Sequence, residues 1–327
     1  MSHAPDSPRA EPAIRTEGLG KRYGRLPIVR DFTFEVRPGE VYALVGPNGA
    51  GKTTVIRLVS GLAFPSEGTV RMLGLDPQQH PEVRRRLGAV VEAPAAFYPY
   101  LSGRANLRLH ARLAGGVAEH RITELLALME LEYAADRKVG VYSLGMRQRL
   151  GVAGALLTQP DVLILDEPAS GMDPLSLHLV HRVLHDAASN GAAVLLSTHH
   201  LDEVASYGSR VGIMEEGELI DEVDLDQRRD RYRLRVDDVH AARQALSAQP
   251  WVADVFLRAG QVIVQLAQAD GLDRVAPLLI QHGMRVHELT ADTFDLRAYY
   301  RERVVAERLR RTEADVPAYP GGRGVDA

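Results

Sequence analysis

Short apolar runs alternate with helical stretches over the first two thirds of the chain. Residues 40–45 read Glu-Val-Tyr-Ala-Leu-Val and predict a buried strand, and residues 53–59 predict a helix. The apolar runs 162–165 and 193–196 predict two further strands of the same sheet. Because strands and helices alternate from about residue 14 to residue 223, this part is expected to form an α/β domain.

Other segments depart from that simple alternation. Residues 28–36 and 68–73 predict strands of an antiparallel portion near the start, and residues 214–219 predict a hairpin. Residues 101–158 carry no strand pattern. A wholly helical insertion, over about residues 95–160, is therefore expected inside the α/β core.

A charged run at residues 224–233 marks a change of domain. The elements expected after it follow the order β-α-β-β-α-β, which predicts a small ferredoxin-like accessory domain. They include a strand at 232–236, a helix at 240–247, strands at 252–257 and 261–266, and a helix at 272–281. This part contains no motif that can be tied to chemistry, so a structural or docking role is expected for it.

The chain is therefore expected to have four parts. The termini, residues 1–12 and 306–327, are expected to be disordered and flexible, because stretches rich in Pro, Gly, Ala and Asp bury little apolar surface. Between them lie the α/β domain at residues 13–223 and the accessory domain at residues 224–305.

Composition narrows the class of protein. A hydrophobic content of 45% and a charged content of 25% over 327 residues are ordinary for a globular protein. The net charge is −4, so nucleic acid is not expected as a partner. The absence of cysteine excludes disulfides, thiolate metal sites and thiol nucleophiles. No apolar run approaches the roughly 20 residues that cross a bilayer, and the first eight residues lack a signal-peptide pattern. A cytoplasmic protein is expected, with any membrane role supplied by a partner.

A glycine-rich loop between the first predicted strand and helix matches G-x-x-x-x-G-K-[ST]. Such a turn directs backbone N–H groups and the positive end of a helix at one anion. Lys52 is expected to reach the β- and γ-phosphates of a nucleotide, and the Thr53 hydroxyl to ligate Mg²⁺. The alternative is a chance glycine-rich turn. The residues expected to bind nucleotide here are Gly46, Pro47, Asn48, Gly49, Ala50, Gly51, Lys52, Thr53 and Thr54.

Polar side chains end two of the predicted strands. Asp166 and Glu167 close one, where open α/β sheets bind ligands. Asp166 is expected to hold Mg²⁺, and Glu167 to orient or deprotonate an attacking water. His199 follows the other strand and could contact a γ-phosphate. Solvated acids and an incidental histidine at strand ends are the alternatives. Ser143 is a natural N-cap, so its helix could supply a second anion site or be only a capped helix.

Taken in order, these motifs resemble the ATP-binding subunit of an ABC transporter over roughly residues 14–223. The family signature appears as Tyr-Ser-Leu-Gly-Met at residues 142–146, which implies roles for Ser143 and Gly145. The resemblance also implies that Asp173 belongs to the D-loop and that His199 is the switch histidine. Tyr23 stands where the family stacks an aromatic ring on adenine, although a surface tyrosine explains it equally well.

Two departures from the family pattern stand out. Glu92 replaces the usual Gln; it keeps an oxygen for Mg²⁺ but adds a negative charge. Leu144 and Met146 replace a Gly and the Gln of the signature. Both departures, and residues 92–107 as a whole, resemble a branch of exporters for peptide antibiotics, bacteriocins and hydrophobic drugs.

The resemblance implies a working arrangement. Two copies would form a head-to-tail homodimer with two ATP molecules between them. Each ATP would be bound by the glycine-rich loop of one subunit, which is the family's Walker A motif, and by the signature of the other subunit. Closure on ATP and opening after hydrolysis would drive a separate transmembrane permease, which holds the subunit at the inner face of the membrane. The alternatives are a non-transport ABC ATPase acting on ribosomes or DNA and a P-loop kinase or GTPase.

Overall fold

The computed structural model describes residues 11–91, 97–228, 230–267 and 271–314, which fall into two compact units. The first unit contains the chain up to Val223 and again from Arg297, and the second contains Asp224–Leu296. The predicted accessory domain extends to residue 305, whereas the second unit ends at Leu296. The predicted tail begins at residue 306, within helix α9, Leu296–Ala314. The last 13 residues lie outside the described part.

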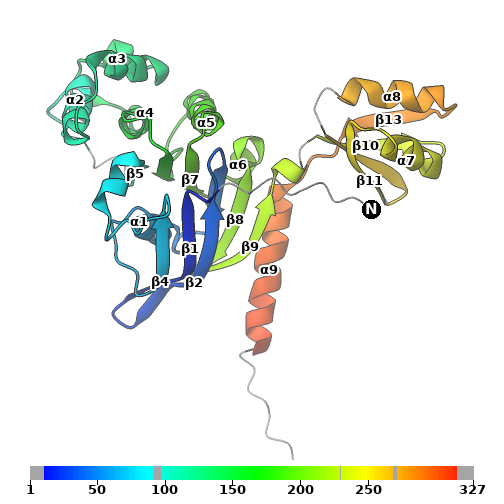
Figure 1. Cartoon of the computed structure of the whole chain (residues 1–327), viewed down its shortest axis with the longest axis horizontal. Helices are drawn as coiled ribbons and strands as arrows, with labels where there is room; N and C mark the ends of the chain where they lie inside the picture. The colour runs from blue at the N-terminus through cyan, green and yellow to red at the C-terminus, as the bar shows by residue number, and fades with distance from the viewer. Residues whose placement is uncertain (1–10, 92–96, 229, 268–270, 315–327) are drawn as a thin grey trace, which may run out of the picture. The chain divides into compact units, whose positions relative to one another are not determined.

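A six-stranded sheet forms the centre of the first unit (Figure 1). Its order is β5-β6-β7-β3-β8-β9, and the β5–β6, β6–β7, β7–β3 and β3–β8 pairs are parallel. Every residue of β3, β6 and β7 is buried, which explains why these strands are apolar up to the polar residues that end β6 and β7. The strands are β3 Val41–Val45, β5 Leu87–Val90, β6 Val162–Asp166, β7 Ala193–Thr198, β8 Arg210–Glu215 and β9 Glu218–Asp224.

A second, three-stranded sheet has the order β2-β1-β4 and is antiparallel throughout. Its strands are β1 Ile14–Tyr23, β2 Leu26–Val36 and β4 Glu67–Met72. The antiparallel portion expected near the start of the chain is therefore confirmed. Apolar side chains of both sheets and of helix α1, Lys52–Val59, share one core, in which Phe32, Tyr42 and Ile56 are fully buried.

The predicted helical insertion is also confirmed. It contains α2 Gly103–Leu113, α3 Glu119–Leu128 and α4 Leu144–Ala155, with two short 3-10 turns between α3 and α4. Serine side chains cap two of these helices: Ser102 accepts a hydrogen bond from the Ala105 amide, and Ser143 accepts one from the Met146 amide. The remaining α-helices that precede the second unit are α5 Pro174–Ser189 and α6 Leu201–Tyr207.

The second unit has the predicted βαββαβ order. Its four strands form an antiparallel sheet in the order β11-β12-β10-β13, and α7 and α8 pack through an apolar core that includes Leu234, Leu246 and Leu279. The elements are β10 Arg231–Val236, α7 Val239–Ser247, β11 Val252–Arg258, β12 Gln261–Leu266, α8 Leu272–Gln281 and β13 Val286–Ala291. Across the described residues, no helix is both long and apolar enough to cross a membrane.

Candidate functional site

The glycine-rich loop joins the end of β3 directly to the start of α1. Gly51 occupies the N-cap position with φ of 106° and offers no side chain to the first turn of the helix. The amides at this helix end therefore remain available to an anion instead of being capped by the protein's own side chain. The structure thus gives residues 46–53 the arrangement that the sequence predicts for a phosphate-binding loop.

Close approach of neighbouring backbone explains two of the loop glycines. A Cβ atom on Gly46 would lie 2.3 Å from the carbonyl oxygen of Met214. On Gly51 it would lie 2.9 Å from the carbonyl oxygen of Ile28 and 2.8 Å from the Met214 methyl carbon. A side chain at either position would force the loop away from the strands behind it.

Lys52 is buried, with 6% of its surface exposed, and its ammonium group remains inside the loop. Its Nζ donates to the carbonyl oxygens of Gly46, at 2.8 Å, and Pro47, at 3.3 Å. The same Nζ lies 3.6 Å from Oε1 of Glu167. The cation is therefore placed where a phosphate chain above the loop could take over its hydrogen bonds.

Glu167 follows directly after β6 and meets His199, which follows β7. The His199 Nδ1 atom lies 2.8 Å from Oε2 of Glu167. Glu167 has φ of 47°, a left-handed conformation that is uncommon for a residue with a side chain. Its amide donates to the Ser197 hydroxyl at 3.0 Å and to the Ser197 carbonyl oxygen at 3.2 Å. These bonds fix the Glu167 backbone at the strand edge, and the contact with His199 orients its carboxylate.

Ser197 also connects Glu167 to Asp166. The Ser197 hydroxyl donates to Oδ1 of Asp166 at 2.5 Å, and Ser197 is fully buried. Asp166 and Ser197 are paired in the parallel register of β6 and β7. Sequence reasoning missed Ser197 as a site residue; the available signal was a hydroxyl that ends an apolar strand two residues before His199.

The oxygen ligands present suit Mg²⁺ bound together with a nucleotide. Asp166 supplies a carboxylate with one oxygen held by Ser197, and Thr53 supplies a hydroxyl on the first turn of α1. Within the described ranges, no group of three or more His, Cys, Asp or Glu side chains could hold a metal ion. That donor set fits Mg²⁺, which is usually held by one or two protein oxygens together with phosphates and water.

The residues of the resembled signature lie beside Gly171, in the segment 170–173 that the resemblance assigns to the D-loop. Ser143 is exposed at the start of α4, and a Cβ on Gly145 would approach the Gly171 carbonyl oxygen to 3.9 Å. Asp173 caps α5 by accepting from the Ser176 amide at 3.0 Å and the Ser176 hydroxyl at 2.8 Å. Both bonds lower the pKa of Asp173, and the bond from the Ser176 amide has the larger effect.

Of the two remaining predicted site residues, Tyr23 and Glu92, only Tyr23 belongs to the described part of the chain. Tyr23 ends β1 and is half exposed, with the Lys21 Nζ 5.0 Å from the centre of its ring. A ring accessible at the surface could stack on a base. Glu92 lies outside the described residues.

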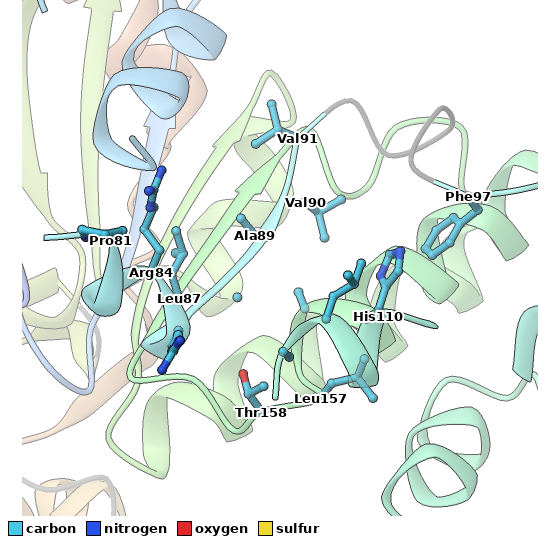
Figure 2. A pocket seen from close by; sticks show the side chains of 17 residues that line it. Pro81, Arg84, Leu87, Ala89, Val90, Val91, Phe97, His110, Leu157 and Thr158 are labelled. Carbon is cyan, nitrogen blue, oxygen red and sulfur yellow. The ribbon is translucent and has the colours of Figure 1, made fainter. Parts of the chain in front are cut away.

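A cavity of about 470 Å³ lies between β5 and the helical insertion (Figure 2). The rings of Phe97 and His110 stack on its insertion side with centroids 5.3 Å apart, and Val90, at the end of β5, faces it from the sheet. No described residue of the glycine-rich loop lines this cavity. It is therefore distinct from the site around Lys52 and Glu167.

Comparisons with known proteins agree with this geometry. The family model described as ABC transporter matches residues 29–170. A bacitracin transport ATP-binding protein of Enterococcus faecalis is 34% identical over 80% of this chain and 87% of its own. A daunorubicin resistance ATP-binding protein of Streptomyces coeruleorubidus is 41% identical over 64% of this chain and 66% of its own.

Solved structures give the same result for the fold. An ATP-binding subunit of an ABC transporter is 32% identical, with a TM-score of 0.61 over 66% of this chain and 92% of that one. A dimeric bacterial ABC transporter cassette is 25% identical, with a TM-score of 0.60 over 65% of this chain and 98% of that one.

The chain belongs to the ABC transporter family. It is an ATP-binding subunit of that family and an ATPase, as the ordered motifs in the sequence predict. The alternative of a non-transport ATPase is not favoured, because the names of relatives describe bacitracin transport, daunorubicin resistance and Nod factor export.

Proposed function

We propose that this chain powers the export of drug-like or peptide-antibiotic compounds through a separately encoded permease. The bacitracin, daunorubicin and Nod factor proteins among its relatives support this role by their names. The subunit would act as a homodimer, peripheral on the inner face of the membrane, where the permease holds it. The net charge of −4 does not favour nucleic acid as a partner.

The convergence of Lys52, Glu167 and His199 at one sheet edge supports ATP hydrolysis most directly. The Lys52 Nζ lies 3.6 Å, and the His199 Nδ1 2.8 Å, from opposite oxygens of the Glu167 carboxylate. Lys52 would bind the β- and γ-phosphates together with the backbone N–H groups of residues 46–54 other than Pro47. Glu167 would orient and deprotonate the attacking water, and His199 would hold Glu167 and sense the γ-phosphate.

Thr53 and Asp166 would hold Mg²⁺, and Glu92 would contribute an oxygen to the ion or to its water. Bound Mg²⁺ would neutralise charge that develops on the phosphates. Ser197 would keep the Asp166 carboxylate oriented through its 2.5 Å hydrogen bond.

Homodimer formation would complete the nucleotide site. The exposed start of α4 at Ser143 and Gly145 would face the ATP bound by the second copy, which has its own α4 facing the first. Asp173 would contribute at the same interface, and Tyr23 would stack on adenine. ATP would then close the dimer, and hydrolysis would open it and move the permease.

Purification from membranes tests the export role. A tagged chain, extracted in detergent from its native cells, is expected to bring down a polytopic membrane protein in comparable amount. In a drug-sensitive host that contains both proteins, the wild type should raise the inhibitory concentration of a peptide antibiotic or an anthracycline. The Glu167→Gln variant should not raise it. Recovery of ribosomes in place of a membrane protein would contradict the proposal.

A further inference from the structure

The turn between β8 and β9 supports the glycine-rich loop from behind. Glu216 and Gly217 both have positive φ, 47° and 87°, the conformation of a type I′ hairpin turn. The Gly217 amide donates to the carbonyl oxygen of Ala50 at 2.9 Å, and the Gly217 carbonyl oxygen accepts from the Arg30 amide at 2.9 Å. The turn is therefore fixed between the loop and β2.

The strand before the turn touches the other end of the same loop. Met214 presents its carbonyl oxygen so close to Gly46 that no Cβ fits between them, and its methyl carbon lies 2.8 Å from the place that a Cβ on Gly51 would take. The hairpin thus contacts the loop at Gly46, Ala50 and Gly51 at once. A shift of residues 214–217 would be transmitted directly to the amides that face the phosphates.

Helix α9 runs beside β9 (Figure 1), and its arginines bind the acidic side chains around this turn. Arg308 donates from Nε and Nη2 to Oε1 of Glu215, at 2.9 and 2.6 Å. Arg311 donates to Glu216 at 2.7 Å and to Glu218 at 2.6 Å. Two arginines of one helix therefore bind three acidic side chains of the hairpin, at positions 215, 216 and 218.

Glu307 fixes the direction of the Arg311 side chain from the preceding turn of α9. Arg311 Nε donates to Oε1 of Glu307 at 2.7 Å, and Arg310 binds the same carboxylate at 2.9 and 2.7 Å. Hydrogen bonds from Arg310, and then from Arg311, lower the pKa of Glu307 to about 2. Glu307 therefore remains anionic at neutral pH and keeps Arg311 directed toward the hairpin.

The ion pair of Arg308 with Glu215 also changes the charge behind the glycine-rich loop. Its side chain is 2% exposed, next to Met214, whose backbone lies against the loop. A buried carboxylate needs a compensating charge, and Arg308 supplies it. Without Arg308, an uncompensated anion would lie behind the loop that binds a polyanion, and it would oppose nucleotide binding.

We propose that α9 is a strap that positions the glycine-rich loop, with Arg308 and Arg311 as the positioning residues that set nucleotide affinity. The second unit, Asp224–Leu296, is inserted in the chain between β9 and α9. One of its chain connections leaves the hairpin through β9, and the other continues into the helix that binds the hairpin. A change in the second unit thus has two routes to the loop that leave the catalytic residues untouched.

The test compares Arg308→Ala with Arg303→Ala in the full chain. Arg303 also ties α9 to β9, through Asp221 at 2.8 Å, but that contact lies away from the turn. Binding of Mg²⁺ and a non-hydrolysable ATP analogue is measured by calorimetry, and hydrogen exchange is followed at residues 46–53. Arg308→Ala is expected to weaken binding about 3- to 10-fold and to speed exchange in the loop. Arg303→Ala is expected to change binding less than 2-fold.

A second background separates positioning from general loss of stability. In Glu215→Gln there is no buried charge to compensate, so adding Arg308→Ala should weaken binding by a clearly smaller factor than in the wild type. Arg308→Lys should recover part of the affinity. The proposal is overturned if folded Arg308→Ala binds as tightly as the wild type with unchanged exchange in the loop. Equal losses for Arg303→Ala and Arg308→Ala would also overturn it.

Discussion

The Lys52 ammonium group lies 3.6 Å from the Glu167 carboxylate, although the two residues are 115 positions apart in the chain. Lys52 is provided by the loop after β3 and Glu167 by the end of β6, with β7 between those strands. The cation proposed to bind phosphate and the carboxylate proposed to activate water therefore share one small site. A γ-phosphate bound at Lys52 would lie within reach of a water held by Glu167.

Replacement of Glu167 tests its role as general base. In Glu167→Gln the side chain keeps its shape but cannot accept a proton, so ATP turnover should fall about 10²- to 10⁴-fold. ATP binding should persist, because the proposed phosphate contacts come from the loop. Steady-state phosphate release and calorimetric ATP binding measure the two effects. Near-normal turnover in the presence of the membrane partner would remove Glu167 from this role.

Replacement of Lys52 should act on binding itself. Lys52→Ala removes a buried cation and its charge-assisted hydrogen bonds to the phosphates. Such bonds contribute roughly 1.5–3 kcal/mol, so ATP affinity should fall by about 10- to 100-fold. Lys138→Ala is the matched control, because Lys138 is exposed in the helical insertion. Equal affinities for the two variants, measured by direct nucleotide binding, would exclude the proposed contact.

Replacement of Ser197 tests the hydrogen bonds that its hydroxyl makes with Asp166 and Glu167. Ser197→Ala removes the donor to Asp166 and one of the acceptors of the Glu167 amide. Mutation of a residue that hydrogen-bonds to a metal ligand typically lowers metal affinity or activity by about 10- to 100-fold. The Mg²⁺ concentration for half-maximal activity should therefore rise, while ATP binding without Mg²⁺ should be unchanged. An unaltered Mg²⁺ dependence would show that Ser197 serves only the packing of β7.

The local parts of the fold and site could be predicted from the sequence. The glycine-rich loop lies between a strand and a helix, so its geometry depends on residues that are neighbours in the chain. Asp166 and Glu167 could be predicted as site residues for the same reason, since an apolar run of four residues leads directly to them. The strands β1 and β5 were harder to predict from the sequence, because β1 contains register shifts and β5 has only four residues.

Contacts between distant segments could not be predicted in this way. The hydrogen bond between Ser197 and Asp166 depends on the register of two parallel strands that are 31 positions apart at this pair. The ion pair of Arg308 with Glu215 joins residues 93 positions apart. Its sequence signal, an arginine-rich helix near the end of the chain, is equally consistent with a solvated helix. Only packing decides which carboxylate such an arginine binds.

His181 on α5 should make the stability of the protein depend on pH. Its ring stacks on Tyr207 with centroids 4.0 Å apart, and the residue is 8% exposed. The pKa of His181 is lowered from 6.5 to about 4. Burial of the ring is the main cause, and the nearby His178 and His200 add to it. Between these two pH values the unfolded chain binds a proton at this position that the folded chain does not.

The contribution of His181 to stability is therefore fully present above pH 6.5 and is lost as the pH falls toward 4. One proton corresponds to at most about 1.4 kcal/mol per pH unit in the free energy of unfolding. Urea unfolding between pH 5 and pH 7.5 should show this slope in the wild type and a smaller slope in His181→Phe, which keeps an aromatic ring beside Tyr207. His185→Gln, at an exposed position of the same helix, should keep the wild-type slope. If His181→Phe and the wild type lose stability in parallel on acidification, then other groups cause the dependence.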